Sequence, residues 1–226
     1  MEITGIIGGS GLENPEILKN RQVINYTGRW GEASSPLLKG KISDKDVIIL
    51  SRHGFDHTIP PTQVNNRANI YALHHMKCDY IITSTACGSL REEIERGDLV
   101  ILDQFIDFTR LRKLSFYESF EPGDMKHVTM ADPFSETIRN KLIESAGELD
   151  MKYHSRGTVV TIEGPRFSTR AESRMFKSLG ADVINMSIAP EAILANELGI
   201  SYGTIAMSTD YDCWHEDEEP VSWKQI

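Results

Sequence analysis

Runs of apolar and β-branched residues recur along the chain, separated by polar segments. Most runs are apolar at nearly every position instead of at alternate positions, which is typical of strands covered on both faces in an α/β sheet. The runs that predict strands are residues 3–7, 47–50, 80–83, 99–102, 159–162, 183–186 and 202–207. They indicate a sheet whose strands are distributed over the whole chain.

Helical patterns lie between several of these runs. Apolar residues recur at helical spacing in residues 65–77 and 171–179, as expected for helices with one buried face. Asp132 followed by Pro133 has the character of an N-cap and a first-turn proline, so we predict that a helix begins there. Residues 190–199 are predicted to form another helix that ends at a glycine.

The composition indicates one soluble domain. The chain has 226 residues, of which 40% are hydrophobic, and no linker-like segment, so we expect a single domain over residues 1–226. Its 24 Lys and Arg against 33 Asp and Glu give a formal net charge of −9, which argues against nucleic acid or an anionic membrane as a partner. No segment has the roughly 20 apolar residues that cross a bilayer, and no signal peptide precedes the domain, so we expect a cytoplasmic protein.

The cysteines and histidines do not form a recognisable metal site. Cys78, Cys87 and Cys213 are odd in number and widely spaced, which favours buried, reduced thiols over disulfides or zinc ligands. His53 and His57 lie four residues apart, but no acidic third ligand accompanies them at helical spacing. No bound metal is therefore expected.

Two glycine-containing motifs that follow predicted strands suggest an oxyanion site. Residues 8–11, Gly-Gly-Ser-Gly, can turn the backbone so that its N–H groups and the Ser10 hydroxyl face an anion. The spacing fits neither a dinucleotide fingerprint nor a Walker motif, and a plain strand-to-helix turn is the alternative. Arg52 and His53 offer a planar fork for phosphate and a group that exchanges protons near neutral pH. An ion-paired arginine beside a packed histidine is the alternative there.

The third motif is residues 83–89, Thr-Ser-Thr-Ala-Cys-Gly-Ser, at the end of the predicted strand at 80–83. Ligands of open α/β sheets bind beyond the carboxyl ends of strands, so Thr85 and the N–H of Ala86 are candidates to contact an anion or a sugar. Cys87 is better interpreted as a structural thiol than as a nucleophile, because no histidine partner can be assigned to it.

Later motifs offer groups for a flat, polar ligand. Phe167 follows a Gly-Pro turn and can stack on a base, although ordinary core packing is the alternative. Asp210 and Asp212 point to the same side of an extended chain, so both carboxyl groups can face one donor-rich ligand edge. A solvated loop with caps is the alternative for this pair.

The joint arrangement is far more specific than any one motif. Residues 5–223 resemble the trimeric purine nucleoside phosphorylase family, and within it the 5′-methylthioadenosine phosphorylases. The resemblance is carried by the motifs Gly-Gly-Ser-Gly, Ser-Arg-His-Gly, Thr-Ala-Cys-Gly-Ser-Leu, Glu-Gly-Pro-Arg-Phe-Ser and Thr-Asp-Tyr-Asp-Cys-Trp. It implies an α/β fold in which a central mixed sheet forms a distorted barrel flanked by helices.

The resemblance also implies a set of site residues. The phosphate-binding residues would be Ser10, Arg52, His53, Thr85, Ala86 and Ser187. Met186 would lie under the ribose and Phe167 against the base, while His127 from a neighbouring subunit would line the pocket for the 5′-methylthio group. Asp210 and Asp212 would be the catalytic pair along the N7 and 6-amino edge of the purine.

The activity implied is phosphorolysis of 5′-methylthioadenosine to adenine and 5-methylthioribose 1-phosphate, a pentosyl transfer in purine and methionine salvage. Inorganic phosphate is the co-substrate, with no cofactor and no metal, and the assembly is a homotrimer or a dimer of trimers. Asp210 favours adenine because a carboxylate accepts from a 6-amino group and repels a 6-oxo group. The alternatives are a phosphorylase that prefers methylthioinosine, inosine or guanosine, and a purine- or phosphate-binding module without turnover. Relatives continue through a C-terminal helical segment that we expect to be missing from residues 1–226.

Overall fold

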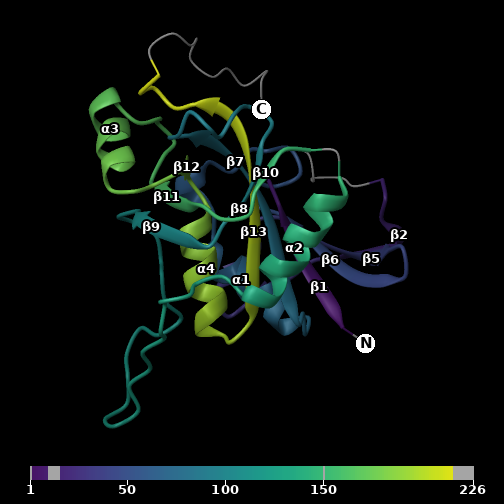
Figure 1. The fold of residues 1–226 in the computed structure, drawn as a ribbon. Helices are drawn as coiled ribbons and strands as arrows, with labels where there is room; N and C mark the ends of the chain where they lie inside the picture. The colour runs from purple at the N-terminus through teal and green to yellow at the C-terminus, as the bar shows by residue number, and fades with distance from the viewer. Residues whose placement is uncertain (1, 10–15, 150, 216–226) are drawn as a thin grey trace.

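One large mixed sheet organises the molecule. The computed structural model describes residues 2–9, 16–149 and 151–215, and within these ranges eleven strands join in the sheet (Figure 1). Its main path runs in the order β10, β8, β13, β7, β1, β6, β5, β2. These strands are β1 (Ile3–Gly8), β2 (Lys19–Ile24), β5 (Leu37–Ile42), β6 (Lys45–Ser51), β7 (Tyr80–Ser89), β8 (Leu99–Ile101), β10 (Tyr153–His154) and β13 (Ser201–Tyr211).

The sheet branches at β7. β12 (Val183–Asn185) pairs antiparallel with the end of β7, and β11 (Thr158–Ile162) and β9 (Gln104–Phe108) continue from it in parallel. A separate two-stranded ribbon is made by β3 (Thr27–Gly28) and β4 (Gly31–Glu32). The prediction of a mixed sheet flanked by helices is therefore confirmed.

Helices cover the sheet (Figure 1). The helical segments are η1 (Pro61–Gln63), α1 (Asn66–His75), α2 (Glu136–Glu148), α3 (Arg170–Ser178) and α4 (Ile188–Glu197). α1 packs on α4, α4 packs on β13 and β9, and α2 packs on β13 and β8. Within the described ranges, no helix is long and apolar enough to cross a membrane.

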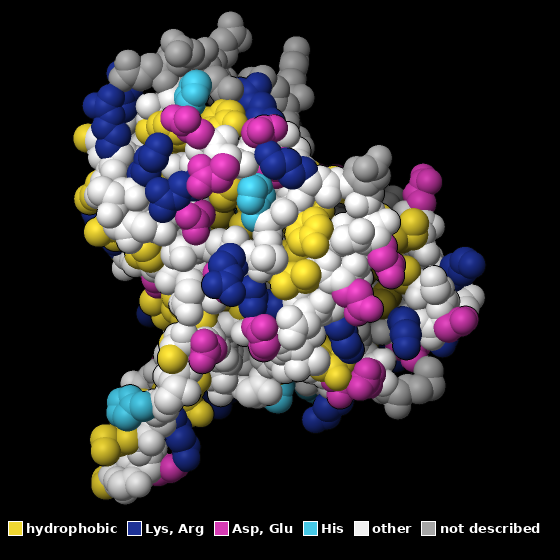
Figure 2. Space-filling view, in the orientation of Figure 1, with side chains coloured by type: hydrophobic (Ala, Val, Ile, Leu, Met, Phe, Trp, Pro, Cys, Tyr) yellow, Lys and Arg dark blue, Asp and Glu magenta, His cyan; other side chains and the backbone are white. Residues whose placement is uncertain are grey.

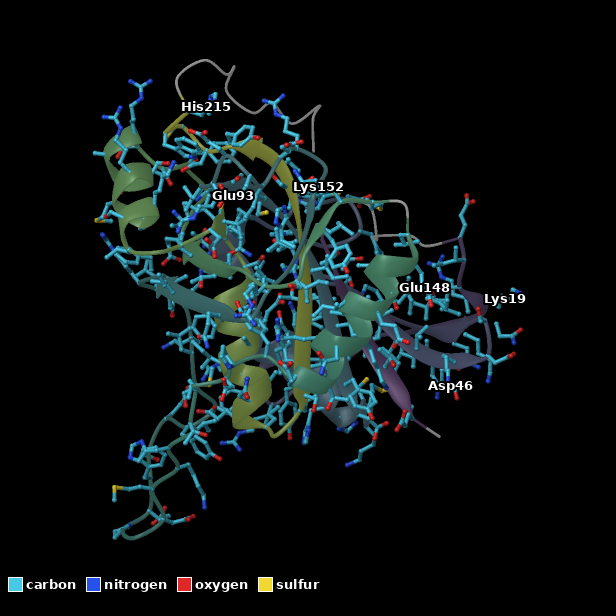
Figure 3. The ribbon with its side chains drawn as sticks, in the orientation of Figure 1. Lys19, Asp46, Glu93, Glu148, Lys152 and His215 are labelled. Atoms are coloured by element: carbon cyan, nitrogen blue, oxygen red, sulfur yellow. The ribbon has the colours of Figure 1, made fainter. Side chains whose placement is uncertain are left out.

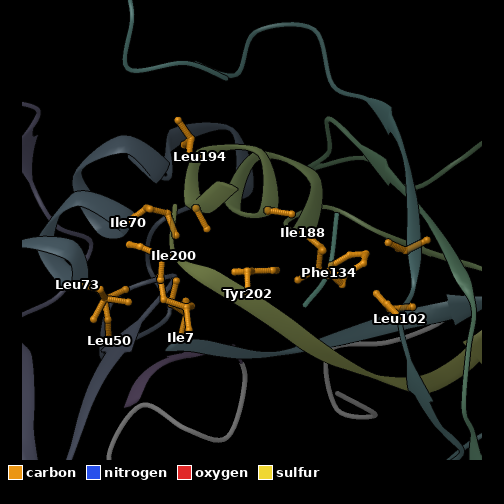
Figure 4. Close-up of a cluster of buried hydrophobic side chains, with 14 of the residues drawn as sticks. Ile7, Leu50, Ile70, Leu73, Leu102, Phe134, Ile188, Leu194, Ile200 and Tyr202 are labelled. Carbon is orange, nitrogen blue, oxygen red and sulfur yellow. The ribbon is translucent and has the colours of Figure 1, made fainter. Parts of the chain in front are cut away.

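The core lies between α1, α4 and the strands β1, β6, β7 and β13. Figure 4 shows part of it, with Ile7, Leu50, Leu73 and Ile200 meeting near the middle of the sheet. Tyr202 points into the same cluster and is 1% exposed. Charged side chains such as those labelled around β2, β6 and α2 in Figure 3 lie at the periphery. A tyrosine at the centre of an apolar cluster needs a partner for its hydroxyl group, which is identified below.

The predicted strands and helices are present, but two features differ. The predicted helix start at Asp132–Pro133 is wrong, because α2 begins at Glu136 after an N-cap at Ser135. The chain bends before it instead of forming a helical turn, and Phe134 is buried against Tyr202, with ring centroids 6.0 Å apart.

The second difference concerns the polar motifs at residues 83–89 and 208–214, which were expected to follow strands. β7 extends to Ser89 and β13 to Tyr211, so Thr85 and Asp210 lie inside the strands, whereas Asp212 directly follows β13. Each strand gains pairing partners along this extension, since β13 pairs with β7 over nearly its whole length. Hydrogen bonding to a neighbouring strand thus overrides the low β-propensity of small polar residues.

Candidate active site

A cavity of about 420 Å³ lies where the carboxyl ends of several strands converge. β6, β1, β7 and β13 are consecutive and parallel, so the segments that follow or end them meet at one edge of the sheet. β12 approaches from the opposite direction because it is antiparallel to β7. The volume is that of a pocket for one small ligand.

Most of the predicted site residues line this cavity. They are Arg52, His53, Thr85, Ala86, Phe167, Met186, Ser187, Asp210 and Asp212. Ser10 lies outside the described residues, although its neighbour Gly9 lines the cavity. His127 does not line it: this histidine is exposed on the long segment between β9 and α2.

One end of the cavity is built around the cation of Arg52, which is 2% exposed. Its Nε and Nη2 donate to Glu191 at 2.5 and 3.1 Å, and its Nη1 donates to the carbonyl oxygen of Ser84 at 3.1 Å. Burial opposes the charge, but the carboxylate of Glu191 more than compensates and raises the pKa of Arg52. Gly9 passes so close that a Cβ there would lie 3.1 Å from Nη1. The guanidinium group is therefore a fixed, permanent cation at the cavity wall.

Hydroxyl groups surround the same end. The Oγ1 of Thr85 lies 3.2 Å from the Oγ of Ser187 and accepts from the Nδ2 of Asn185 at 3.3 Å. The Oγ1 of Thr161 donates to the Oδ1 of Asn185 at 2.8 Å and accepts from the N–H of Ala189 in the first turn of α4. This network connects three strands to a helix and fixes the Thr85 and Ser187 hydroxyl groups beside Arg52. Hydroxyl and guanidinium donors of this kind bind oxyanions.

His53 is held in one orientation next to Arg52. Its Nδ1 lies 2.8 Å from the carbonyl oxygen of Ile59, and its ring stacks on His57 with centroids 4.6 Å apart. Burial, followed by the charge of Arg52, lowers the pKa of His53 to about 4. At neutral pH the ring is uncharged, so Nδ1–H donates to Ile59 and Nε2 is left as an acceptor.

The other end of the cavity carries the two aspartates. Asp210 is 9% exposed and Asp212 is 8% exposed. A register shift between Ser208 and Asp210 places Asp210 opposite Gly88, and a Cβ at Gly88 would lie 3.1 Å from the Oδ1 of Asp210. A bulge of this kind re-aims a strand side chain, and here the missing side chain at position 88 leaves room for the carboxyl group.

The polar atoms at this end differ in how they are satisfied. The Oδ2 of Asp210 accepts from the Oγ1 of Thr209 at 2.7 Å. The Oδ2 of Asp212 and the Oγ of Ser168 are buried without a hydrogen-bond partner among the described residues. Buried polar atoms that lack a partner indicate a place for a ligand group.

Two side chains offer apolar surface to a ligand. Phe167 is 60% exposed at the rim, so it does not take part in the core packing that was its alternative interpretation. Met186 contacts the turn at Gly164, whose φ of +65° requires glycine. Cys87 also lines the cavity, but burial and then the charge of Asp210 raise the pKa of its thiol. A protonated thiol is a poor nucleophile.

Sequence reasoning missed Glu191 and Asn185 as parts of the site. Both belong to residues 185–191, in which only Met186 and Ser187 were assigned a function. A signal was present for Glu191, since it is the one acidic residue in the first turn of a helix that is otherwise largely apolar. No group of three or more possible metal ligands occurs among the described residues.

Comparison with known proteins assigns the chain to a class. The model of the phosphorylase superfamily matches residues 3–225. The chain belongs to the phosphorylase superfamily.

Individual relatives narrow this assignment. An S-methyl-5′-thioadenosine phosphorylase from Xenopus tropicalis is 55% identical over 98% of this chain and 80% of that protein. One from Danio rerio is 52% identical over 96% of this chain and 78% of that protein. Within the superfamily the chain therefore belongs to the S-methyl-5′-thioadenosine phosphorylase family, which confirms the resemblance found in the sequence.

Solved structures agree with this result. Methylthioadenosine phosphorylase from Schistosoma mansoni in complex with adenine is 41% identical and superimposes with a TM-score of 0.92 over 100% of this chain and 84% of that one. A mutant of adenosine/methylthioadenosine phosphorylase from the same organism, in complex with methylthioadenosine, has a TM-score of 0.89 at 41% identity, over 95% of this chain and 82% of that one.

The lowered pKa of His53 predicts a pH dependence of stability. The unfolded chain takes up a proton on this histidine near pH 6.5 and the folded protein only near pH 4, so stability falls as the pH decreases through this window. His53→Asn keeps a donor for Ile59 but does not titrate. This substitution should reduce the decrease in the free energy of unfolding by up to about 1.4 kcal/mol per pH unit.

Urea unfolding at pH 7, 6 and 5 measures the difference. His75→Asn, which replaces an exposed histidine of α1, is the control for loss of one imidazole. If wild type and His53→Asn lose stability in parallel as the pH falls, His53 is not held uncharged by its surroundings.

Proposed function

We propose that this protein cleaves 5′-methylthioadenosine with inorganic phosphate, releasing adenine and 5-methylthioribose 1-phosphate. The observation that carries the proposal is one cavity that is lined both by a buried guanidinium group and by two buried carboxyl groups. It is supported by the family to which the chain belongs and by the methylthioadenosine bound to the similar Schistosoma mansoni enzyme.

The phosphate would bind at the Arg52 end. Arg52, the hydroxyl group of Ser187 and the backbone at Ala86 would supply donors, and Ser10 belongs to the same proposed set. The hydroxyl group of Thr85 donates to the carbonyl oxygen of Ala86 at 3.0 Å and would turn to the phosphate when it binds. A hydrogen phosphate dianion also carries one O–H group, and the free Nε2 acceptor of an uncharged His53 suits it. The remaining oxygens face the sugar, so the nucleophile is oriented without a metal or a cofactor.

The reaction would replace one bond at the sugar by another. As the bond from C1′ to N9 of the purine stretches, the ribosyl centre becomes cationic and is stabilised by the facing phosphate. A phosphate oxygen then bonds to C1′. The electron pair of the broken bond goes to the purine, which takes up one proton at N7 from Asp210 in its protonated form. The phosphate loses its one O–H proton as the sugar 1-phosphate dianion forms, and this proton restores Asp210.

The carboxyl groups would also select the base. The unpartnered Oδ2 of Asp212 can accept a hydrogen bond from the 6-amino group of adenine. A 6-oxopurine would place an acceptor there instead and leave the buried oxygen unsatisfied. Phe167 would cover the face of the base, and Met186 would lie under the ribose.

We test the function by following adenine release from methylthioadenosine in buffer with and without inorganic phosphate. Release should require phosphate and should yield the sugar 1-phosphate in equal amount, because phosphate is the nucleophile. Adenosine and inosine are assayed alongside, and inosine should be used far less well. Equal adenine release in phosphate-free buffer, with free methylthioribose as product, contradicts the proposal; ligand binding in calorimetry without any release contradicts it as well.

Asp210→Asn should lower kcat/KM for methylthioadenosine by about 10²- to 10⁴-fold, because an amide cannot supply the proton for N7. Asp210 and Asp212 would lie along the same N7 and 6-position edge of the purine, and an amide at position 210 can donate to a 6-oxo group there, so the use of inosine relative to methylthioadenosine should rise. Asp46→Asn is the matched control, because Asp46 on β6 forms a surface ion pair with Lys41 on β5. It should leave kcat/KM for both substrates unchanged. An unchanged substrate ratio in Asp210→Asn would count against its role.

We also propose that the protein is a cytoplasmic homotrimer, or a dimer of trimers, in which His127 lines a neighbouring subunit's site. Residues 109–131 form an arm that extends away from the body at the lower left of Figure 1, and Figure 2 shows hydrophobic side chains along it. Among these, Leu111 is 81% and Met125 is 67% exposed. Apolar side chains presented in this way are typical of an interface.

The base of the arm is firmly attached. Glu163 accepts from the backbone of Arg110 and Leu111 and from the side chain of Arg112. Glu197 at the end of α4 accepts from Ser115 and from the backbone N–H of Phe116. An arm held at its base costs less entropy when it docks on another subunit.

Met125→Glu should weaken this assembly because it buries a charge at the interface. Sedimentation velocity should then detect smaller species than in wild type at the same concentration. Val23→Glu, at an equally apolar and 58% exposed position on the edge strand β2, is the control and should not change the mass. A monomeric wild type would refute the trimer.

A further inference from the structure

A buried row of polar groups lies behind Arg52 on the side away from the cavity. The hydroxyl group of Tyr202 donates to the Oε2 of Glu191 at 2.8 Å and lies 2.9 Å from the Oγ1 of Thr83. Glu191 in turn accepts from the Nε and Nη2 of Arg52. The row therefore connects β7, β13 and α4 to the segment after β6. It also supplies the partner that the core hydroxyl group of Tyr202 requires.

All four side chains are almost completely removed from solvent. Glu191 is 0%, Tyr202 and Thr83 are 1% and Arg52 is 2% exposed. Burying an ion pair usually gains little over well-packed apolar side chains, while leaving one partner unpaired is strongly destabilising. Stability alone is therefore a poor reason to bury a glutamate in the first turn of a largely apolar helix. Positioning the arginine is a better one.

Three hydrogen bonds fix the plane of the Arg52 guanidinium group. Glu191 contacts one edge through two nitrogens, and the carbonyl oxygen of Ser84 contacts Nη1. Gly9 also passes close to the group, since a Cβ there would lie 3.1 Å from Nη1. Of the five N–H donors of an arginine, these three bonds leave one on Nη1 and one on Nη2 for a ligand.

We propose that Glu191, itself held by Tyr202, is a positioning residue that orients Arg52 toward the phosphate. This inference rests on the proposed function. Bidentate contact fixes the arginine more tightly than a single bond does, and Tyr202 fixes the carboxylate from behind. Burial, together with the neighbouring Glu191, raises the pKa of Tyr202, so its hydroxyl group stays a donor throughout the working pH range.

Two conservative variants test the row from its two ends. Glu191→Gln removes the charge and one of the two acceptors but keeps the shape, so Arg52 becomes free to reorient. The KM for phosphate should rise by about tenfold or more, because small misplacements of a binding group are costly, whereas the KM for methylthioadenosine should stay within about twofold. Tyr202→Phe should also raise the KM for phosphate, by a smaller factor.

The chain offers a matched control for the tyrosine. Tyr80 also donates to a glutamate, Glu2, at 3.0 Å, but at an exposed site. Tyr80→Phe should leave both KM values as in wild type. A merely structural loss in Tyr202→Phe or Glu191→Gln would lower the amount of active enzyme without separating the two KM values, and that result would overturn the inference.

A double variant covers the case in which Glu191→Gln folds poorly. Arg52→Met leaves the glutamate buried without its partner, so the melting temperature should drop. Adding Glu191→Gln to Arg52→Met should then raise the melting temperature instead of lowering it further, and should cause no additional change in the KM for phosphate. If Glu191→Gln still changes the KM for phosphate when Arg52 is absent, the glutamate does not act through the arginine.

The same assays separate this inference from the function on which it rests. Wild-type enzyme that releases no adenine in the presence of phosphate refutes the proposed function. Wild-type enzyme that releases adenine, with a Glu191→Gln variant whose two KM values are unchanged or change together, refutes only the role of Glu191.

Discussion

The ion pair between Arg52 and Glu191 is the interaction around which the cavity is built. A protein with a net charge of −9 has no general attraction for an anion, so an oxyanion site must concentrate positive charge locally. A buried arginine does so, but it is stable only with a counter-charge and a complete set of hydrogen-bond acceptors. Glu191 supplies the counter-charge, and together with the carbonyl oxygen of Ser84 it accepts from three of the five N–H donors. The remaining two donors need an acceptor, which a bound anion can supply.

The sheet supplies the second constraint, since it brings distant segments to one edge. Parallel pairing of β6, β1, β7 and β13 places the segment after β6 and the end of β13 around the same space. The bulge before Asp210 and the absence of a side chain at Gly88 then admit a carboxyl group at the far end. A cation and two carboxyl groups thus line one cavity, an arrangement suited to a reaction in which an anion attacks and a base departs.

Several features could be predicted from residue patterns because they depend on local chemistry. The all-apolar runs predicted the buried strands, and the residues that terminate them predicted Arg52, Thr85 and Asp210 as site residues. Glu191 was not predicted, because a glutamate in the first turn of a helix is ordinarily a surface residue that favours the helix dipole. Only its burial against Arg52 and Tyr202 gives it another role. The start of α2 was also mispredicted, since burial of Phe134 overrides a favourable cap and proline.

The sequence by itself determined the family, the order of strands and helices, and the residue types available for the chemistry, because periodicity and motif spacing are local properties of a chain. The tertiary structure decided which of these groups are neighbours, which are buried, and which of their hydrogen bonds are already made. These properties decide that His53 is uncharged, that Arg52 is held in a fixed plane and that the Oδ2 of Asp212 lacks a partner among the described residues. They depend on contacts between segments up to 139 residues apart, and the order of residues along the chain does not contain them.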